Sequence, residues 1–251
     1  MMGAEREDAM RNLPIVRSQE TRYTRDSAFS YACHACRRCC HDKIIQLNPY
    51  EVARLAENRR ITTTEFLARY AERNGTALQR VEEGACVFLT PEGCGVHQDR
   101  PLVCRLYPLG RKVTAEGEES FREVAPHPET EGTYGTGSTV EEFLARQGAG
   151  PFIEAVDQYV DVVAHMTAAL VGAMRGSEKL KDEVRGAIDE LVQGQDEAIQ
   201  EWIDMDLVVT RYCVRQTLPI PTEVSGKMAL HIQAIEEWVQ SILTVKKEEK
   251  V

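Results

Sequence analysis

The chain has 251 residues, of which 43% are hydrophobic, and its formal net charge at pH 7 is −10. This length suits one large domain or two small ones, and the hydrophobic content is sufficient for a buried core. The acidic balance argues against a general nucleic-acid partner, because such binding needs a continuous basic surface.

The N-terminus and the apolar runs predict a cytoplasmic protein without a membrane partner. Residues 1–10 are charged and lack the apolar stretch of a secretory signal. The longest apolar run, residues 162–174, includes His165 and is shorter than the ~20 residues that cross a bilayer. Cytosolic thiols stay reduced, so a disulfide framework is the weaker interpretation of the cysteines.

The first expected element is a cysteine loop. Four of the eight cysteines lie within residues 33–40, spaced Cys-x-x-Cys-x-x-Cys-Cys. Thiols separated by two residues can converge on one metal ion or on one face of an iron–sulfur cluster. Because adjacent side chains usually diverge, we expect Cys40 to serve a second centre, an outer position or a redox role, and not the centre of Cys39.

Two helices are expected after this loop, and each begins with a capping box. Asn48, Pro49 and Glu51 begin the first. Residues 62–65, Thr-Thr-Thr-Glu, begin the second, which we expect to end at Gly75.

Two later segments supply further thiols. A short strand from Cys86 and a Pro-Glu-Gly turn would return Cys94 to its side. Asp99 can cap a helical turn that carries Cys104 and that Pro108 ends. The predicted metal ligands are therefore Cys33, Cys36, Cys39, Cys40, Cys86, Cys94 and Cys104.

Basic residues lie close in sequence to these cysteines. They would lower the pKa of the thiols and offset the charge of an anionic thiolate cluster, or they would form an ordinary solvated surface. The sequence leaves both interpretations open for Arg37, Arg38, Lys43, Arg100, Arg105, Arg111 and Lys112.

A hairpin and then a helical region are expected beyond the cysteines. The hairpin has strands at 111–114 and 121–124. Ser138 and Glu141 form a capping box for a helix through residue 146, and Pro151 begins a longer helix. Its expected buried face is Ile153, Val156, Val160 and Val163. Further helices are predicted at about 178–193, 196–215 and 222–245.

These elements define an α+β, mostly α, fold class with a cysteine-rich part and a helical part. Residues 128–137 are rich in Gly and Thr and are interpreted as a flexible linker. We therefore predict an N-terminal extension at 1–26, a cysteine-rich metal-cluster domain at 27–127, this linker, and a helical domain at 138–247.

Over roughly residues 28–112 the chain resembles the YkgJ-like CxxCxxCC cysteine-cluster family, a zinc- or iron-chelating domain. The cysteine loop, the Leu-x-Pro-x-Glu-x-x-Arg-Leu-Ala run at 47–56 and the segment at 100–108, Arg-Pro-Leu-Val-Cys-Arg-Leu-Tyr-Pro, carry this resemblance. The Gly-rich segment and the helical part also give a weaker resemblance to members of the flagellin lysine N-methylase type. The first resemblance implies an iron–sulfur or zinc centre.

The cysteine spacing favours iron over zinc. Cys-x-x-Cys-x-x-Cys with a remote fourth thiol is typical of a [4Fe–4S] cluster, whereas two Cys-x-x-Cys pairs are typical of zinc. We expect Cys33, Cys36, Cys39 and one remote thiol to hold such a cluster. The other thiols would form a second metal position or support the first, and zinc remains the alternative.

Four other residues need a separate interpretation. His34 is expected to be polar surface, while His41 and His97 are open as ligands or outer hydrogen-bond donors. Cys213 lies in a helical context and is expected to be a small buried core residue.

The leading hypothesis is a metal-cluster protein that acts in electron transfer or in a cluster-dependent modification. The alternatives are a non-catalytic adaptor stapled by zinc and a protein-lysine N-methylase-like enzyme. Whether the protein is an enzyme stays open, and its partner is an unidentified protein or protein substrate, with no nucleic acid and no membrane.

Overall fold

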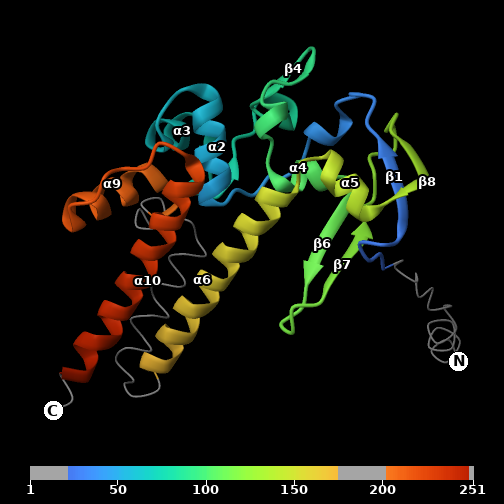
Figure 1. The fold of residues 1–251 in the computed structure, drawn as a ribbon. Helices are drawn as coiled ribbons and strands as arrows, with labels where there is room; N and C mark the ends of the chain where they lie inside the picture. The colour runs from blue at the N-terminus through green and yellow to red at the C-terminus, as the bar shows by residue number, and fades with distance from the viewer. Residues whose placement is uncertain (1–21, 175–201, 249–251) are drawn as a thin grey trace, which may run out of the picture.

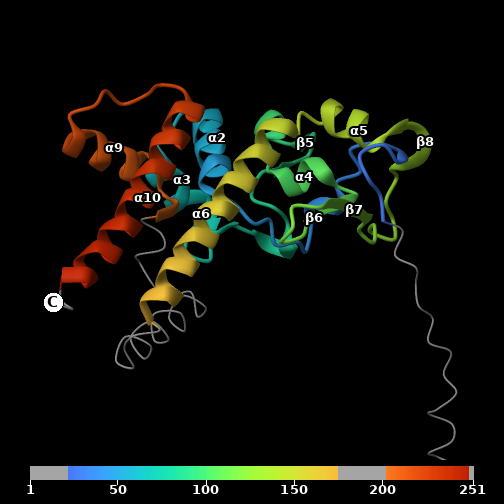
Figure 2. The ribbon, with the colours of Figure 1, turned by 60° about the horizontal axis from the view of Figure 1, so that its bottom comes forward.

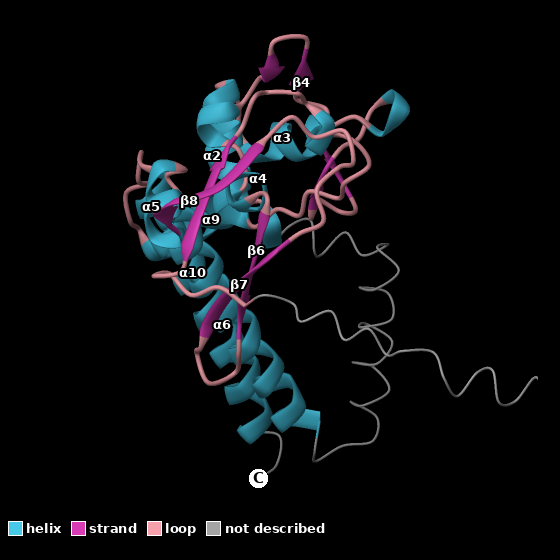
Figure 3. Cartoon of the chain, turned by 90° about the vertical axis from the view of Figure 1, so that its right-hand side faces the viewer, coloured by secondary structure: helices cyan, strands magenta, loops and turns pink. Residues whose placement is uncertain are grey.

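A computed structural model describes residues 22–174 and 202–248. In 169–174 and 241–248 it describes the backbone only. Figure 1 shows small strands and short helices on one side and two long helices, α6 and α10, projecting from the other. The strands occur in antiparallel pairs between helices (Figure 3), which confirms the predicted α+β, mostly α, class.

The two predicted capping boxes are confirmed. Helix α2 (Pro49–Arg59) begins at Asn48, and helix α3 (Thr63–Tyr70) begins at Thr62. However, α3 ends at Tyr70, so the expected stop at Gly75 is wrong. The chain instead forms the strand pair β2 (Ala71–Glu72) and β3 (Ala77–Leu78), and Gly75, with φ +86°, lies in the turn between them.

Two short hairpins follow at the predicted places, although the first strand begins at Leu89 and not at Cys86 as expected. Strands β4 (Leu89–Thr90) and β5 (Gly93–Cys94) pair antiparallel, and so do β6 (Leu109–Val113) and β7 (Glu119–Glu123). The turn between β6 and β7 contains Gly117 in the left-handed region, with φ +84°.

The Gly-rich segment differs from the expected flexible linker. Residues Thr133–Thr139 form strand β8, which pairs antiparallel with β1 (Ala28–Ala32). At Gly132 an added Cβ would lie 2.0 Å from the hydroxyl oxygen of Tyr31, so glycine permits the close approach there. The segment is thus a strand that closes over the start of the cysteine loop.

The helical part begins at α5 (Val140–Arg146), whose capping box is Thr139 and Glu142, one residue later than expected. The longer helices are α6 (Gly150–Met174), α9 (Met205–Gln216) and α10 (Val224–Glu248). Helices α6 and α10 pack against each other (Figure 2). The helix expected at 178–193 and the start of that expected at 196–215 lie outside the described residues.

The buried face of α6 also differs from the prediction. Val160 and Val163 are each 60% exposed, whereas Tyr159 and Val162 are buried. The face that includes Tyr159 packs against α10, and this contact decides which residues of the helix are covered.

Two hydrophobic clusters hold the described residues together. The first joins Leu102 and Leu106 to Phe143 and Phe152 and to Met205 of α9, so it spans the predicted cysteine-rich and helical regions. The second surrounds the fully buried side chain of Phe66. The half-buried side chains of Cys86, Cys94 and Cys104 pack against this second cluster.

The described helices contain none that combines the length and the apolar character needed to traverse a lipid bilayer.

Candidate metal centre

A tight turn presents the first four thiols. Arg37 adopts the left-handed conformation with φ 67°, and a 3₁₀ turn, η1 (Arg38–Cys40), follows it. The N–H of Cys40 donates to the Arg37 carbonyl oxygen at 2.9 Å. Cys39 and Cys40 therefore occupy one short turn after the end of β1.

Backbone pairing joins this turn to the second thiol segment. The N–H of Cys86 donates to the carbonyl oxygen of Cys40 at 2.9 Å, and His41 pairs with Ala85. In the hairpin beyond, Leu89 pairs with Cys94, and the thiol of Cys94 interacts electrostatically with that of Cys86, as the predicted return of the chain implies.

The third thiol segment is held by a carboxylate that is distant in sequence. Cys104 lies in α4 (Leu102–Leu106), and the N–H of Leu102 donates to Glu51 Oε1 at 2.6 Å. The expected cap, Asp99, instead accepts hydrogen bonds from Arg54 and Asn58 of α2. The prediction that Asp99 caps this helix was wrong, because the buried carboxylate of Glu51 accepts the hydrogen bond at the helix start.

Five thiols converge within electrostatic range of one another. Those of Cys39 and Cys40 share a side-chain hydrogen bond, so the expected divergence of these two side chains is wrong. The thiol of Cys40 also interacts with those of Cys104 and Cys86, and the thiol of Cys104 with that of Cys94. We call the side chains of Cys39, Cys40, Cys86, Cys94 and Cys104 the thiol cluster.

The pKa values within the thiol cluster divide it into one acidic thiol and several weakly acidic ones. The hydrogen bond from Cys40, with help from the charges of Lys43 and His41, lowers the pKa of Cys39 to about 6. The same hydrogen bond and burial raise the pKa of Cys40, and burial raises those of Cys86 and Cys104. The cluster thus accommodates one thiolate readily, and a bound cation would stabilise further ones.

Cys33 and Cys36 interact with side chains that also border the thiol cluster. Cys33 is exposed and interacts electrostatically with Arg100 and Tyr31, while the half-buried Cys36 lies near Tyr107. Cys39 also interacts with both of these tyrosines, so the predicted trio of Cys33, Cys36 and Cys39 stays a prediction.

In residues 22–174 and 202–248, no three His, Cys, Asp or Glu side chains are grouped tightly enough to hold one metal ion. The donor chemistry nevertheless fits zinc or an iron–sulfur cluster, because thiolates are the ligands of both and five thiols from three segments lie within electrostatic range of their neighbours. Metal-binding thiols often close on the metal only as it binds, since each must lose its proton.

The three nearby histidines differ in their capacity to bind a metal. His41 Nδ1 lies 3.3 Å from the Arg37 carbonyl oxygen, which can only accept, so Nδ1 carries the proton and Nε2 retains a lone pair. His97 Nδ1 accepts from Arg100 at 3.2 Å, which places its proton on Nε2. His34 is exposed, as expected. Of these histidines, His41 is the one that interacts electrostatically with a thiol of the cluster, that of Cys39.

The structure separates the nearby basic residues into two groups. Arg100 and Lys43 interact electrostatically with thiols. Arg38 pairs with Glu129, and Arg111 pairs with Glu119 and Asp157. Of the basic residues near the cysteines in sequence, Arg100 and Lys43 are thus placed to offset the charge of thiolates.

Tyrosines that were not expected at the site flank the cysteine loop. The rings of Tyr31 and Tyr107 meet edge to face at 6.0 Å, and Tyr134 packs on Tyr31 at 5.0 Å. The Nζ atom of Lys43 lies 4.1 Å above the ring of Tyr107. The only sequence signal was the position of Tyr107, three residues after Cys104.

Cys213 is confirmed as a core residue. It is 1% exposed in α9, and its Sγ lies 3.7 Å from the carbonyl oxygen of Pro219. Helix α9 therefore supplies no thiol to the cluster.

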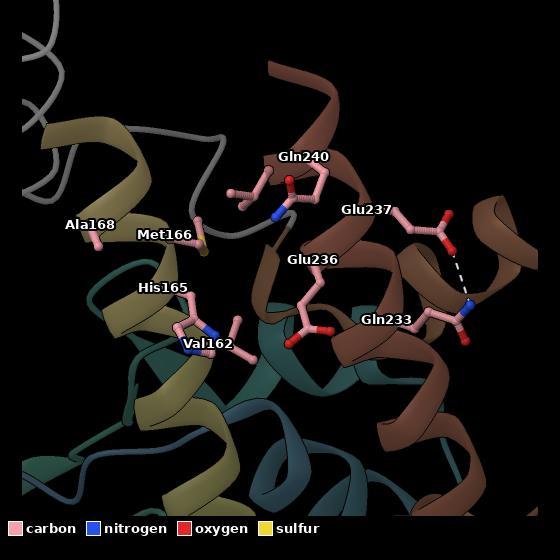
Figure 4. Close-up of a pocket in the computed structure, with 9 residues that line it drawn as sticks. Val162, His165, Met166, Ala168, Gln233, Glu236, Glu237 and Gln240 are labelled. Carbon is pink, nitrogen blue, oxygen red and sulfur yellow. Dashed lines mark hydrogen bonds between the residues drawn. The ribbon is translucent and has the colours of Figure 1, made fainter. Parts of the chain in front are cut away.

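Two cavities lie away from the thiols. The larger, of about 910 Å³, opens between α6 and α10 and is lined by His165, Met166, Gln233 and Glu236 among others (Figure 4). The smaller, of about 130 Å³, lies where α2 and α3 meet Asp206 and Lys227. Neither cavity is lined by a cysteine.

Comparison with known proteins identifies the cysteine-rich region. Residues 32–126 match the CxxCxxCC family model, described as "Putative zinc- or iron-chelating domain". This match confirms the YkgJ-like resemblance over those residues and indicates a domain that chelates zinc or iron. No curated protein and no solved structure matches the chain.

Proposed function

We propose that the thiol cluster binds an iron–sulfur centre, of the [4Fe–4S] type, and that the protein acts in electron transfer or in a cluster-dependent modification. The observation that supports this most is the approach of five thiols, delivered by three separate segments, to one another. Four thiolates hold either a tetrahedral zinc ion or a four-iron cluster, so the preference for iron rests on the Cys-x-x-Cys-x-x-Cys spacing of Cys33, Cys36 and Cys39.

The residues that would hold the centre are those of the thiol cluster, with Cys33 and Cys36 close by on the exposed loop. When bound, an iron–sulfur centre supplies one-electron redox chemistry. The protein contributes partial burial of Cys86 and Cys104, which reduces their contact with water, and the positive charges of Arg100 and Lys43, which stabilise bound thiolates.

All eight cysteines lie within the described residues and form no disulfide there. Reduced thiols are those that can bind metal, and they persist in the cytosol. A cytoplasmic location and an unidentified protein partner therefore remain part of the proposal.

Anaerobic purification followed by visible absorption, iron, zinc and sulfide analysis tests the proposal. We expect a coloured protein that contains iron and acid-labile sulfide. A colourless protein with one equivalent of zinc would overturn the iron–sulfur assignment and leave the metal-binding domain intact.

The zinc-stapled adaptor is the second candidate. Val160 and Val163 are exposed on one face of α6, as expected of a helix that binds a partner. Unfolding followed by circular dichroism with and without a chelator, together with a redox titration, separates the two candidates, because the adaptor depends on metal for folding but has no redox transition. No described feature favours the N-methylase-like alternative.

A further inference from the structure

Arg105 fixes the segment between Cys94 and Cys104 by binding three backbone carbonyl oxygens. Its side chain is 5% exposed, and Nε donates to Arg100 O at 2.9 Å while the two terminal nitrogens donate to Gln98 O and Gln147 O. The guanidinium carbon also lies 3.9 Å from the centre of the Phe152 ring. Since Gln147 and Phe152 belong to the helical part, Arg105 joins that part to the helix of Cys104.

Arg100 is a half-buried cation that lies beside thiols. Its guanidinium donates to the carbonyl oxygen of His97, to His97 Nδ1 and to Gln147 Oε1, the last at 2.6 Å. No carboxylate in the described part of the chain forms an ion pair with it. Its electrostatic partners are the thiols of Cys104, Cys94 and Cys33, in decreasing order of interaction.

Gln147 therefore contacts both arginines at once. It follows α5 directly, and Gly148, with φ +60°, turns the chain immediately afterwards. Because a guanidinium can only donate, the side-chain oxygen of Gln147 must face Arg100, while its backbone oxygen binds Arg105. Removing the side chain would free one end of the Arg100 guanidinium, which His97 still holds at the other end, and would leave the Arg105 bond in place.

We propose that Gln147, which lies beyond the matched family domain, is a positioning residue for the metal centre that orients Arg100 as the counter-charge of the thiols. The inference rests on the proposed metal binding. It implies that the domain at 32–126 binds metal at full affinity only when the segment after α5 is docked on it.

The test compares Zn²⁺ affinity of the metal-free full chain, measured by competition with a chromophoric chelator, in four variants. Loss of partners in the outer shell of a metal site typically weakens binding by roughly 10- to 100-fold. We expect about tenfold weaker binding for Gln147→Ala and a larger loss for Arg100→Met, with Arg100→Lys closer to wild type. Gln158→Ala is the control, because this half-buried glutamine bonds only within α6, to Glu154.

A second readout separates positioning from folding. We expect the melting temperature of metal-free Gln147→Ala to equal that of wild type, while the thiolate charge-transfer band of the Co²⁺-loaded protein shifts. Two results would overturn the role of Gln147 without affecting the proposed function. One is wild-type affinity in Gln147→Ala, and the other is a loss of affinity that comes with a matching loss of stability in the metal-free protein. Wild-type protein that binds neither zinc nor iron would instead overturn the proposed function, and this inference with it.

Discussion

The contact between Cys39 and Cys40 is the residue-scale feature that changes the expected ligand assignment. The sequence suggested separate centres, because adjacent side chains usually diverge. The left-handed Arg37 and the 3₁₀ turn instead bring both thiols together, and Cys40 faces Cys86 and Cys104 as well. Left-handed backbone at non-glycine residues of the loop, Ala35 and Arg37, accompanies this arrangement, and the sequence carries no clear signal for it.

We therefore expect Cys39→Ser and Cys40→Ser to lose the metal equally and completely. Both thiols belong to one cluster, so replacing either removes a ligand from the same centre. Metal content per chain after anaerobic purification measures this, and Cys213→Ser, at a buried core position, is the matched control. Partial loss in Cys40→Ser alone would favour two separate centres.

At the scale of helices and strands, the sequence predicted features that depend on neighbouring residues, but it did not predict pairing between distant segments. The capping boxes at Asn48 and Thr62 lie within four residues, and the sequence predicted both. Strand β8 was missed because its partner β1 lies about a hundred residues earlier and because its Gly-rich sequence has low strand propensity. Pairing between distant segments decides such elements.

Glu51 shows how one residue can serve a local and a distant role. Its carboxylate accepts from the N–H of Asn48 in the capping box of α2 and from the N–H of Leu102 at the start of α4. Burial raises the pKa of this carboxyl to about 7. The sequence disclosed the first role only, since the second joins residues 51 positions apart.

Replacing Glu51 should disturb the presentation of Cys104. We expect Glu51→Ala to lower the free energy of unfolding by about 1–3 kcal/mol, because two buried N–H groups lose their acceptor, and to weaken metal binding. Chemical denaturation and chelator competition measure these two effects. Asp99→Ala is the control, since Asp99 contacts α2 and not α4; metal binding weakened equally in both variants would contradict the assignment of Glu51 as the cap.

A buried histidine joins α6 to α10 and predicts a pH effect. His231 Nε2 donates to the Trp202 carbonyl oxygen at 2.9 Å, so Nδ1 accepts from the hydroxyl of Tyr159. Burial lowers the pKa of His231 to about 4, below its ordinary value of 6.5. The neutral form is therefore favoured in the folded state, and stability present above pH 6.5 is lost as the pH falls towards 4.

Relative to a His231→Gln variant, the wild type should lose about 3 kcal/mol of unfolding free energy between pH 7 and pH 4. Urea denaturation at several pH values measures the difference curve, in which contributions from groups such as Glu51 cancel. A difference independent of pH would show that His231 is not held neutral.

At the scale of the whole molecule, the contacts cross the domain boundary that the sequence suggested. Thr63 at the start of α3 and Asp206 in α9 bond reciprocally: each backbone N–H donates to the other side chain at 2.9 Å. Asp204 also accepts from the hydroxyls of Thr63 and Thr64. Lys227 of α10 pairs with Asp206 at 2.7 Å. The sequence indicated the helices but not these polar contacts, because no local pattern pairs residues about 140 positions apart.

This shared core predicts that the cysteine-rich and helical parts unfold together. Leu102 and Leu106, beside Cys104, share a hydrophobic cluster with Met205 and Val209 of α9, so neither part retains its core when the other unfolds.

Two natural probes report on the two parts. The ring centres of Trp202 and Trp238 lie 4.6 Å apart in the helical part, and in a Cys213→Ser background the remaining thiols all lie in the cysteine-rich part. We expect tryptophan fluorescence and thiol labelling to give the same denaturation midpoint for metal-free protein, and both to move upward together when metal binds. Two separate midpoints, with only the thiol transition shifted by metal, would show that the parts fold independently despite their common core.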